Sequence, residues 1–265
     1  MEPNNAPHYF AWHFPKDDLI YVACPLMIND RVRIAGFMVR KTTAVELAGN
    51  LLARMQAGSR SVLLFANTNF IVQCRGLLPQ IDDPDIVIVN DGIGMDIGAA
   101  MIYHERFPQN LNGTDFTPFL LRQAGRPLRL FLLGGKPHIA VRAADYVRKQ
   151  LGQEVVGICD GYGGMSDLNL LDRIQRQQPD ILLVALGNPV QEQWIMQHWE
   201  ALNVPLVMGV GALFDFWAGA KPRAPRVVQS LRLEWLYRLC LEPRRLLRRY
   251  TVDILRFLLY CYRYR

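Results

Sequence analysis

Short polar and glycine-rich segments recur along this chain, each placed after a run of β-branched or aliphatic residues. They are residues 67–69, 90–94, 134–137, 160–164, 187–192 and 211–215. Glycines let a backbone approach a ligand closely, and the start of the helix that follows favours a phosphate group. One such segment alone more often makes a tight turn between a strand and a helix. The whole set indicates a site of nucleotide size.

Asp91 is the residue in these segments best suited to catalysis. It lies between the apolar residues 85–89 and Gly92. A carboxylate placed there is expected to be partly desolvated, which raises its pKa and makes it a better general base. The alternative is that Asp91 caps the helix that follows. The residues alone favour neither role.

Two further patterns are weaker. Gly92, Gly94 and Gly98 resemble a dinucleotide-binding turn, but residues 112–115, where an acidic strand end is expected, form a turn into a helix. A nicotinamide-dependent oxidoreductase therefore stays a minor alternative. Asp83 and Asp85 have the spacing of a metal-binding DxD motif. Asp85 opens a strand, as Asp180 does, so these acids are expected at the amino ends of strands, away from a ligand.

Histidine and cysteine patterns predict neither a metal site nor a cofactor. No histidine has a partner at catalytic spacing, and no two cysteines form a CxxC pair. Reduced, buried thiols are expected. The histidines are His8, His13, His104, His138 and His198, and the cysteines are Cys24, Cys74, Cys159, Cys240 and Cys261.

The hydrophobic pattern predicts alternating strands and helices. Strands are expected at 19–22, 32–39, 61–66, 85–89, 128–133, 154–159, 180–186 and 205–209, after a loose leader at 1–18. Helices are expected at 95–103, 115–124, 137–151, 166–178 and 190–202, and another from Thr43 to Met55, where Glu46 completes a capping box. The fold class is therefore α/β, with a mainly parallel, Rossmann-like sheet covered by helices on both faces. Ligands bind such sheets at the carboxyl ends of the strands.

Charge divides the chain of 265 residues into two parts. The net charge is +6, but residues 221–265 hold twelve Lys or Arg and three acids, giving +9 there and −3 elsewhere. We expect an α/β domain at 1–220 and a basic helical appendage at 221–265 with an anionic partner. Neither a signal peptide nor an apolar run long enough for a transmembrane helix is apparent. A homo-oligomer is left open.

Residues 228–265 are expected to form two helices that are broken at Glu242-Pro243. In the second helix, basic residues recur on one side and mainly apolar residues on the other. The basic residues are Arg245, Arg249, Arg256 and Arg263, and the other side holds Leu247, Tyr250, Ile254, Leu258 and Cys261. Such a helix is typical of a protein that binds a membrane surface. Packing on the body or on another subunit, and nucleic-acid binding, are the alternatives.

An ordered set of motifs resembles the WecG/TagA/CpsF glycosyltransferase family over roughly residues 30–250. The motifs lie at 90–94, 112–115, 131–135, 179–182, 186–192, 209–216, 218–219, 223–225, 233–239 and 242–245. Residues 90–97 and 110–116 are most similar to the GumM-type enzyme of xanthan or acetan assembly.

The resemblance implies an inverting enzyme without a DxD metal site. Its donor would be a UDP-sugar and its acceptor a sugar on a polyprenyl diphosphate, used at the cytoplasmic face of the inner membrane, where the appendage docks. The GumM-type similarity implies UDP-glucose, a glucosyl-diphospho-polyprenol acceptor and a β-1,4 linkage for exopolysaccharide biosynthesis. UDP-N-acetylmannosamine transfer to an N-acetylglucosaminyl lipid is the alternative. No nucleic acid is implied.

The resemblance also assigns residues. Asp91 matches the family's base, and the family's Thr-x-Asn appears as residues 67–69, so Asn69 fits, Asn67 stands at the threonine position and Thr68 is its candidate substitute. Residues 189–192 lack the lysine of the family's Pro-Lys-Gln-Glu. The expected substrate-binding residues are Gly92, Asp115, Gly134, Gly135, Gln191, Glu192, Arg223, Arg238 and Arg244.

Overall fold

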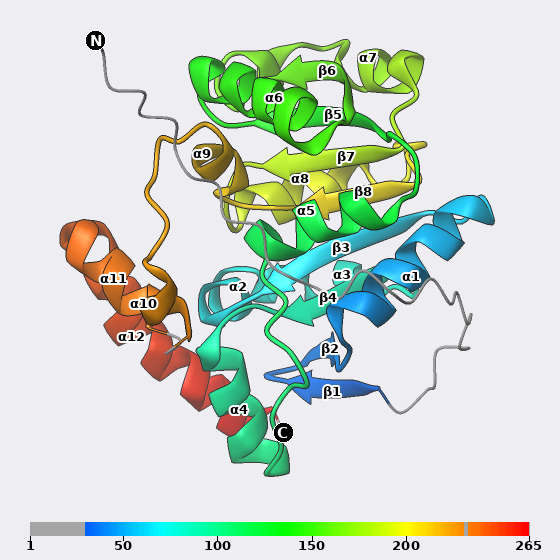
Figure 1. Ribbon diagram of the computed structural model, residues 1–265. Helices are drawn as coiled ribbons and strands as arrows, with labels where there is room; N and C mark the ends of the chain where they lie inside the picture. The colour runs from blue at the N-terminus through cyan, green and yellow to red at the C-terminus, as the bar shows by residue number, and fades with distance from the viewer. Residues whose placement is uncertain (1–29, 231–232, 265) are drawn as a thin grey trace, which may run out of the picture.

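An eight-stranded sheet organises the protein, as the computed structural model shows for residues 30–230 and 233–264 (Figure 1). The strand order is β1-β2-β4-β3-β8-β7-β5-β6, and only β1 and β2 are antiparallel. The strands are β1 (Arg31–Ile34), β2 (Phe37–Arg40), β3 (Ser61–Ala66), β4 (Ile86–Asn90), β5 (Arg129–Gly134), β6 (Glu154–Cys159), β7 (Ile181–Ala185) and β8 (Leu206–Gly209). The predicted mainly parallel α/β fold is confirmed.

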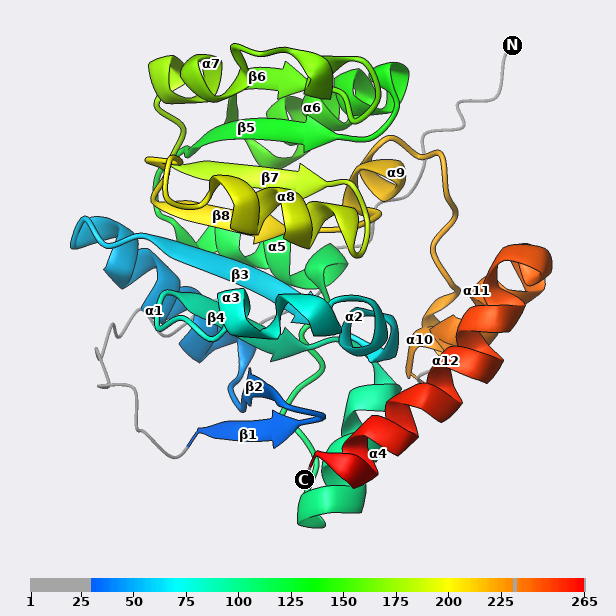
Figure 2. The same cartoon turned by 180° about the vertical axis from the view of Figure 1, so that it is seen from behind.

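Helices cover both faces of the sheet, and each face has its own apolar core. One core lies under α1 (Ala44–Gln56), α5 (Gly113–Gln123), α6 (Pro137–Leu151) and α9 (Leu213–Trp217), which face the viewer in Figure 1. The other lies under α2 (Thr68–Gln73), α3 (Leu78–Ile81), α4 (Ile93–Tyr103), α7 (Leu170–Gln177) and α8 (Val190–His198), as the reverse view in Figure 2 shows. Because both faces are covered, β3, β4 and β7 are buried along their whole length.

Local sequence signals account for most element boundaries. Thr43 and Glu46 form the predicted capping box of α1. The prediction of one strand at 32–39 is wrong, because Ala35 and Gly36 have positive φ angles of 49° and 95° and turn the chain into the β1–β2 hairpin. The predicted helix 190–202 ends at His198, and the helix predicted at 166–178 covers only Leu170–Gln177. The predicted leader and the strand at 19–22 lie outside the described residues.

The acids of the DxD-like motif lie at the amino ends of strands, as expected. Asp85 precedes β4 and pairs with Arg54, and Asp180 precedes β7 and pairs with Arg126. Among the described cysteines, three are buried and Cys240 is exposed, which corrects the expectation that all are buried. Burial raises the pKa of the Cys261 thiol to about 12.

The C-terminal appendage consists of α10 (Arg226–Ser230), α11 (Glu234–Leu241) and α12 (Pro243–Arg263). Its predicted break at Glu242-Pro243 is confirmed. Helix α12 packs on α2 and α4, and Phe257 and Cys261 fill the space that the missing side chain of Gly98 leaves. At its end, the rings of Tyr260 and Tyr264 lie 4.5 and 3.8 Å from the Arg75 guanidinium. No helix within residues 30–230 and 233–264 is long and apolar enough to cross a bilayer.

Candidate active site

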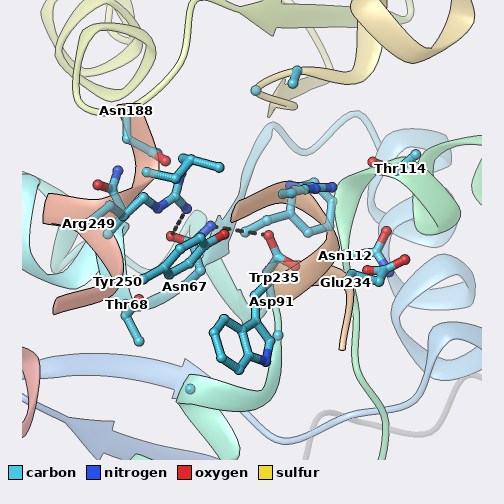
Figure 3. A pocket seen from close by; sticks show the side chains of 18 of the residues that line it. Asn67, Thr68, Asp91, Asn112, Thr114, Asn188, Glu234, Trp235, Arg249 and Tyr250 are labelled. Carbon is cyan, nitrogen blue, oxygen red and sulfur yellow. Dashed lines mark hydrogen bonds between the residues drawn. The ribbon is translucent and has the colours of Figure 1, made fainter. Parts of the chain in front are cut away.

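A cavity of about 1290 Å³ lies between the carboxyl ends of the strands and the appendage (Figure 3). The segments after β3, β4, β7 and β8 form one wall, and α11 and α12 form the other. This volume exceeds that of typical sites for a single small ligand, which range up to about 1,000 Å³. The cavity therefore has room for a nucleotide-sized ligand together with a second molecule.

Asp91 lies in this cavity directly after β4. Its backbone N–H donates to the Ala66 carbonyl at 2.7 Å, which extends the pairing of β4 with β3 by one residue. Burial raises the pKa of the Asp91 carboxyl, and Asp115 adds to the rise, whereas Arg238, the Asn67 hydrogen bond and Arg249 oppose it. The carboxyl is thus partly buried and has a proton affinity higher than usual, as a general base requires.

Asn67 connects Asp91 to the appendage. It is the N-cap of α2, where its Oδ1 accepts from Phe70 N–H at 3.1 Å. Its Nδ2 donates to Asp91 Oδ2 at 3.2 Å, and its Oδ1 also accepts from Arg249 of α12 at 3.3 Å (Figure 3). The cavity wall therefore joins β3, β4 and α12 through one side chain.

Basic and acidic side chains of the appendage enter the cavity together. Arg223 pairs with Asp115 of α5 at 2.5 Å and lies 4.0 Å from Glu234 of α11. Burial raises the pKa of Glu234, while Arg223 and Arg238 oppose the rise. Arg238 faces the same space and lies 5.4 Å from the Phe216 ring. Acids match most of the charge of Arg223, and Arg238 and Arg249 add further positive charge to the same cavity.

Two aromatic rings of the appendage face the region of Asp91. Trp235 of α11 and Tyr250 of α12 line the cavity and meet edge to face, with ring centroids 5.7 Å apart. Figure 3 shows both rings beside Asp91 and Asn67. Aromatic surfaces with nearby polar groups are typical of small-molecule sites.

Gln191 and Glu192 hold the cavity lining in place through hydrogen bonds. Gln191 Oε1 accepts from the Gly187 and Gly211 amides at 3.2 and 2.9 Å, which ties together the segments after β7 and β8. Glu192 Oε1 accepts from the side chains of Asn188 and Gln191. Burial raises the pKa of Glu192, which is only 1% exposed. Gln191 and Asn188 line the cavity, whereas Glu192 acts on it through them.

The sequence matches the glycosyl transferase WecG/TagA/CpsF family over residues 32–265, nearly the whole chain. The chain belongs to this family. It is therefore a glycosyltransferase, an enzyme that moves a sugar from a donor to an acceptor in the assembly of a polysaccharide or cell-wall glycan. The cavity, with the partly buried Asp91 carboxyl, is the candidate active site of this glycosyltransferase.

Most of the site residues predicted from the sequence meet in this cavity. Its lining includes Thr68, Asn69, Asp91, Gly92, Gln191, Arg223 and Arg238. Asp115 and Glu192 lie behind the lining and bond to it. Gly134, Gly135 and Arg244 are not part of the lining. Their roles in substrate binding stay predictions that the geometry of this glycosyltransferase does not support.

Backbone packing explains why glycine is needed at the end of β5, without any role in binding. A Cβ on Gly134 would lie 2.3 Å from the Ala185 carbonyl oxygen, and the Gly135 amide already donates to that oxygen at 3.1 Å. Strand β5 is separated from β3 by β7 and β8, so the segment after it lies to one side of the cavity. Arg244 is exposed near the start of α12.

The structure also identifies site residues that the sequence did not. Asn67 bonds Asp91, whereas the methyl group of Thr68, the residue predicted for this role, lies against Gly94. The sequence placed Arg249 on the basic side of its helix and named no partner for it, and the structure places it against Asn67. The sequence predicted no role for Trp235, which it only included in the motif at 233–239. Within the described residues, no three His, Cys, Asp or Glu side chains group as a metal site.

Proposed function

We propose that this glycosyltransferase inverts the anomeric centre and transfers glucose from UDP-glucose to a glucosyl-diphospho-polyprenol. The product would be a β-1,4-linked disaccharide lipid for exopolysaccharide synthesis. The observation that carries the proposal is the partly buried Asp91 carboxyl, which faces a cavity walled by cationic helices. The choice of glucose depends on the GumM-like motifs at 90–97 and 110–116.

In the proposed reaction, Asp91 accepts the proton of the acceptor hydroxyl as that oxygen attacks the donor's anomeric carbon. The new C–O bond forms on one face of the sugar, and the bond to UDP breaks on the opposite face. One in-line displacement therefore inverts the configuration. Burial supports this role, because it raises the proton affinity of Asp91.

The UDP that leaves carries developing negative charge on its diphosphate. Arg238 and Arg249 supply positive charge on the cavity wall, and Arg223 adds to it. Fixed cations in a partly desolvated site stabilise such charge more strongly than water does. These contacts support a reaction that does not require a metal ion.

The exposed face of α12 supports action at a membrane. Leu255, Leu259 and Tyr262 are 68%, 59% and 67% exposed, and Arg248, Arg256 and Arg263 lie beside them on exposed surface. Apolar side chains flanked by arginines suit the headgroup region of an anionic bilayer. We place the enzyme peripherally at the cytoplasmic face of the inner membrane, where a polyprenyl-linked acceptor is held.

Transfer from radiolabelled UDP-glucose, UDP-N-acetylmannosamine and UDP-N-acetylglucosamine to lipid acceptors in detergent, with EDTA present, tests the proposal. We expect glucose transfer to the glucosyl lipid. Transfer of N-acetylmannosamine instead would keep the reaction class and replace the substrates. Activity that appears only after magnesium is added would overturn the metal-independent mechanism.

Asp91→Asn tests the base. The amide cannot accept the proton, so we expect kcat to fall by about 10²–10⁴-fold with little change in thermal stability. Asp85→Asn is the matched control, since Asp85 lies at the other end of the same strand and outside the cavity. Near-normal turnover by Asp91→Asn would remove Asp91 from the mechanism.

A further inference from the structure

The Asn67 carboxamide links the candidate base to α12, with Asp91 on its nitrogen side and Arg249 on its oxygen side. We propose that Asn67 is a positioning residue that couples the docking of α12 to the orientation and charge of the Asp91 carboxylate. The inference rests on the proposed function, in which Asp91 is the general base. It concerns the residue that follows β3 and caps α2.

The orientation of the Asn67 amide follows from its neighbours. The Phe70 N–H and the Arg249 guanidinium can only donate, so both must face Asn67 Oδ1. Nδ2 therefore points the other way, where Asp91 Oδ2 accepts from it. An amide flip would break all three hydrogen bonds, so the assignment does not depend on telling oxygen from nitrogen.

Helix α12 contributes one of these three bonds. Asn67 begins α2, and α12 packs directly on α2. When α12 is docked, Arg249 and Phe70 together hold Oδ1 and thereby aim Nδ2 at Asp91. When α12 is not docked, the Phe70 bond alone holds Oδ1, and the amide has more freedom to turn from the carboxylate.

A carboxamide is suited to this task in a way that a hydroxyl is not. It has a donor atom and an acceptor atom on opposite sides of one rigid group, whereas a threonine hydroxyl must use one oxygen for both roles. Asn67 can thus cap α2, bond Asp91 and accept from α12 with one side chain.

Charged groups from three helices face Asp91 and determine its pKa, which can be measured. Arg238 of α11 and Arg249 of α12 lower its pKa, Asp115 of α5 raises it, and Glu234 of α11 lies in the same field. The Asn67 hydrogen bond also lowers the pKa of Asp91. Loss of the Asn67 donor or of Arg249 should therefore raise it.

The test compares wild type with Asn67→Asp and Arg249→Met in two measurements. One is an NMR titration of the Asp91 carboxyl carbon, assigned with Asp91→Asn, and the other is the pH dependence of kcat/KM for transfer. Aspartate caps a helix as well as asparagine does, so α2 is preserved while the donor to Asp91 is lost. Its added negative charge also raises the pKa of Asp91, so the Asn67→Ala background, which adds no charge, isolates the hydrogen bond. We expect both variants to titrate at higher pH and to lose about tenfold or more of kcat/KM on the acid side, and less on the alkaline side.

Arg263→Met is the control for charge, because Arg263 is exposed at the far end of the same helix. It should leave the Asp91 titration unchanged. In an Asn67→Ala background, Arg249→Met should have a smaller effect than in wild type. An equal effect would mean that Arg249 acts only through space, which overturns the coupling, as would an unchanged titration in Asn67→Asp. Shifted titrations without transfer from any donor would instead overturn the proposed function and leave the coupling intact.

Discussion

Glu192 is a carboxyl group placed where water hardly reaches, and its effect on stability has a definite sign. Burial raises its pKa above the ordinary 4.5, so the folded protein binds this proton more tightly than the unfolded chain does. Its contribution is therefore most favourable below the ordinary pKa and is lost as pH rises towards the folded-state pKa. Glu192→Gln keeps the oxygen that accepts from Asn188 and Gln191. We expect its melting temperature, relative to wild type, to increase between pH 4 and pH 8, with exposed Glu200→Gln showing no such trend. A constant difference across this range would contradict a raised pKa.

Helix α12 shows what the helical periodicity of a sequence can predict and what it cannot. The pattern predicted a helix after Pro243, and that helix exists. The predicted apolar side does not hold together, because Leu247 is 57% exposed whereas Cys261 is buried. Phe257 and Cys261 face inward, whereas Leu255 and Leu259 form a second apolar strip that faces outward. We expect the double variant Leu255→Ser and Leu259→Ser to bind anionic vesicles at least about tenfold more weakly in sedimentation, because each leucine loses apolar burial in the headgroup region. Its melting temperature should match wild type, while Phe257→Ala should destabilise the fold by about 3–5 kcal/mol. Unaltered vesicle binding would assign membrane contact to another surface.

Strand order at the scale of the whole molecule decides which polar segments share a site. The sequence predicted nearly every strand and placed glycine-rich segments at their carboxyl ends, because both signals are local. It could not predict that β3, β4 and β8 are neighbours while β5 and β6 lie beyond β7, since that depends on long-range packing. Gly135 is therefore expected to matter for folding more than for binding. Its φ of +70° makes Gly135→Ala strained, and we expect a loss of about 1–3 kcal/mol in denaturant unfolding with the KM for the donor unchanged. A raised KM in folded protein would restore Gly135 to the substrate site.

The two faces of α12 imply that the enzyme's rate depends on the concentration of acceptor within the membrane surface. One face lines the cavity and the other carries the exposed leucines, so about 10–12 Å, the width of a helix with its side chains, separates them. On a bilayer, a lipid-linked sugar could enter the cavity while its hydrocarbon tail stays in the membrane. The enzyme would then encounter its acceptor by lateral diffusion in two dimensions. In mixed micelles its velocity should follow the mole fraction of acceptor in the surface, and diluting that surface with detergent should slow transfer even at a constant bulk concentration of acceptor.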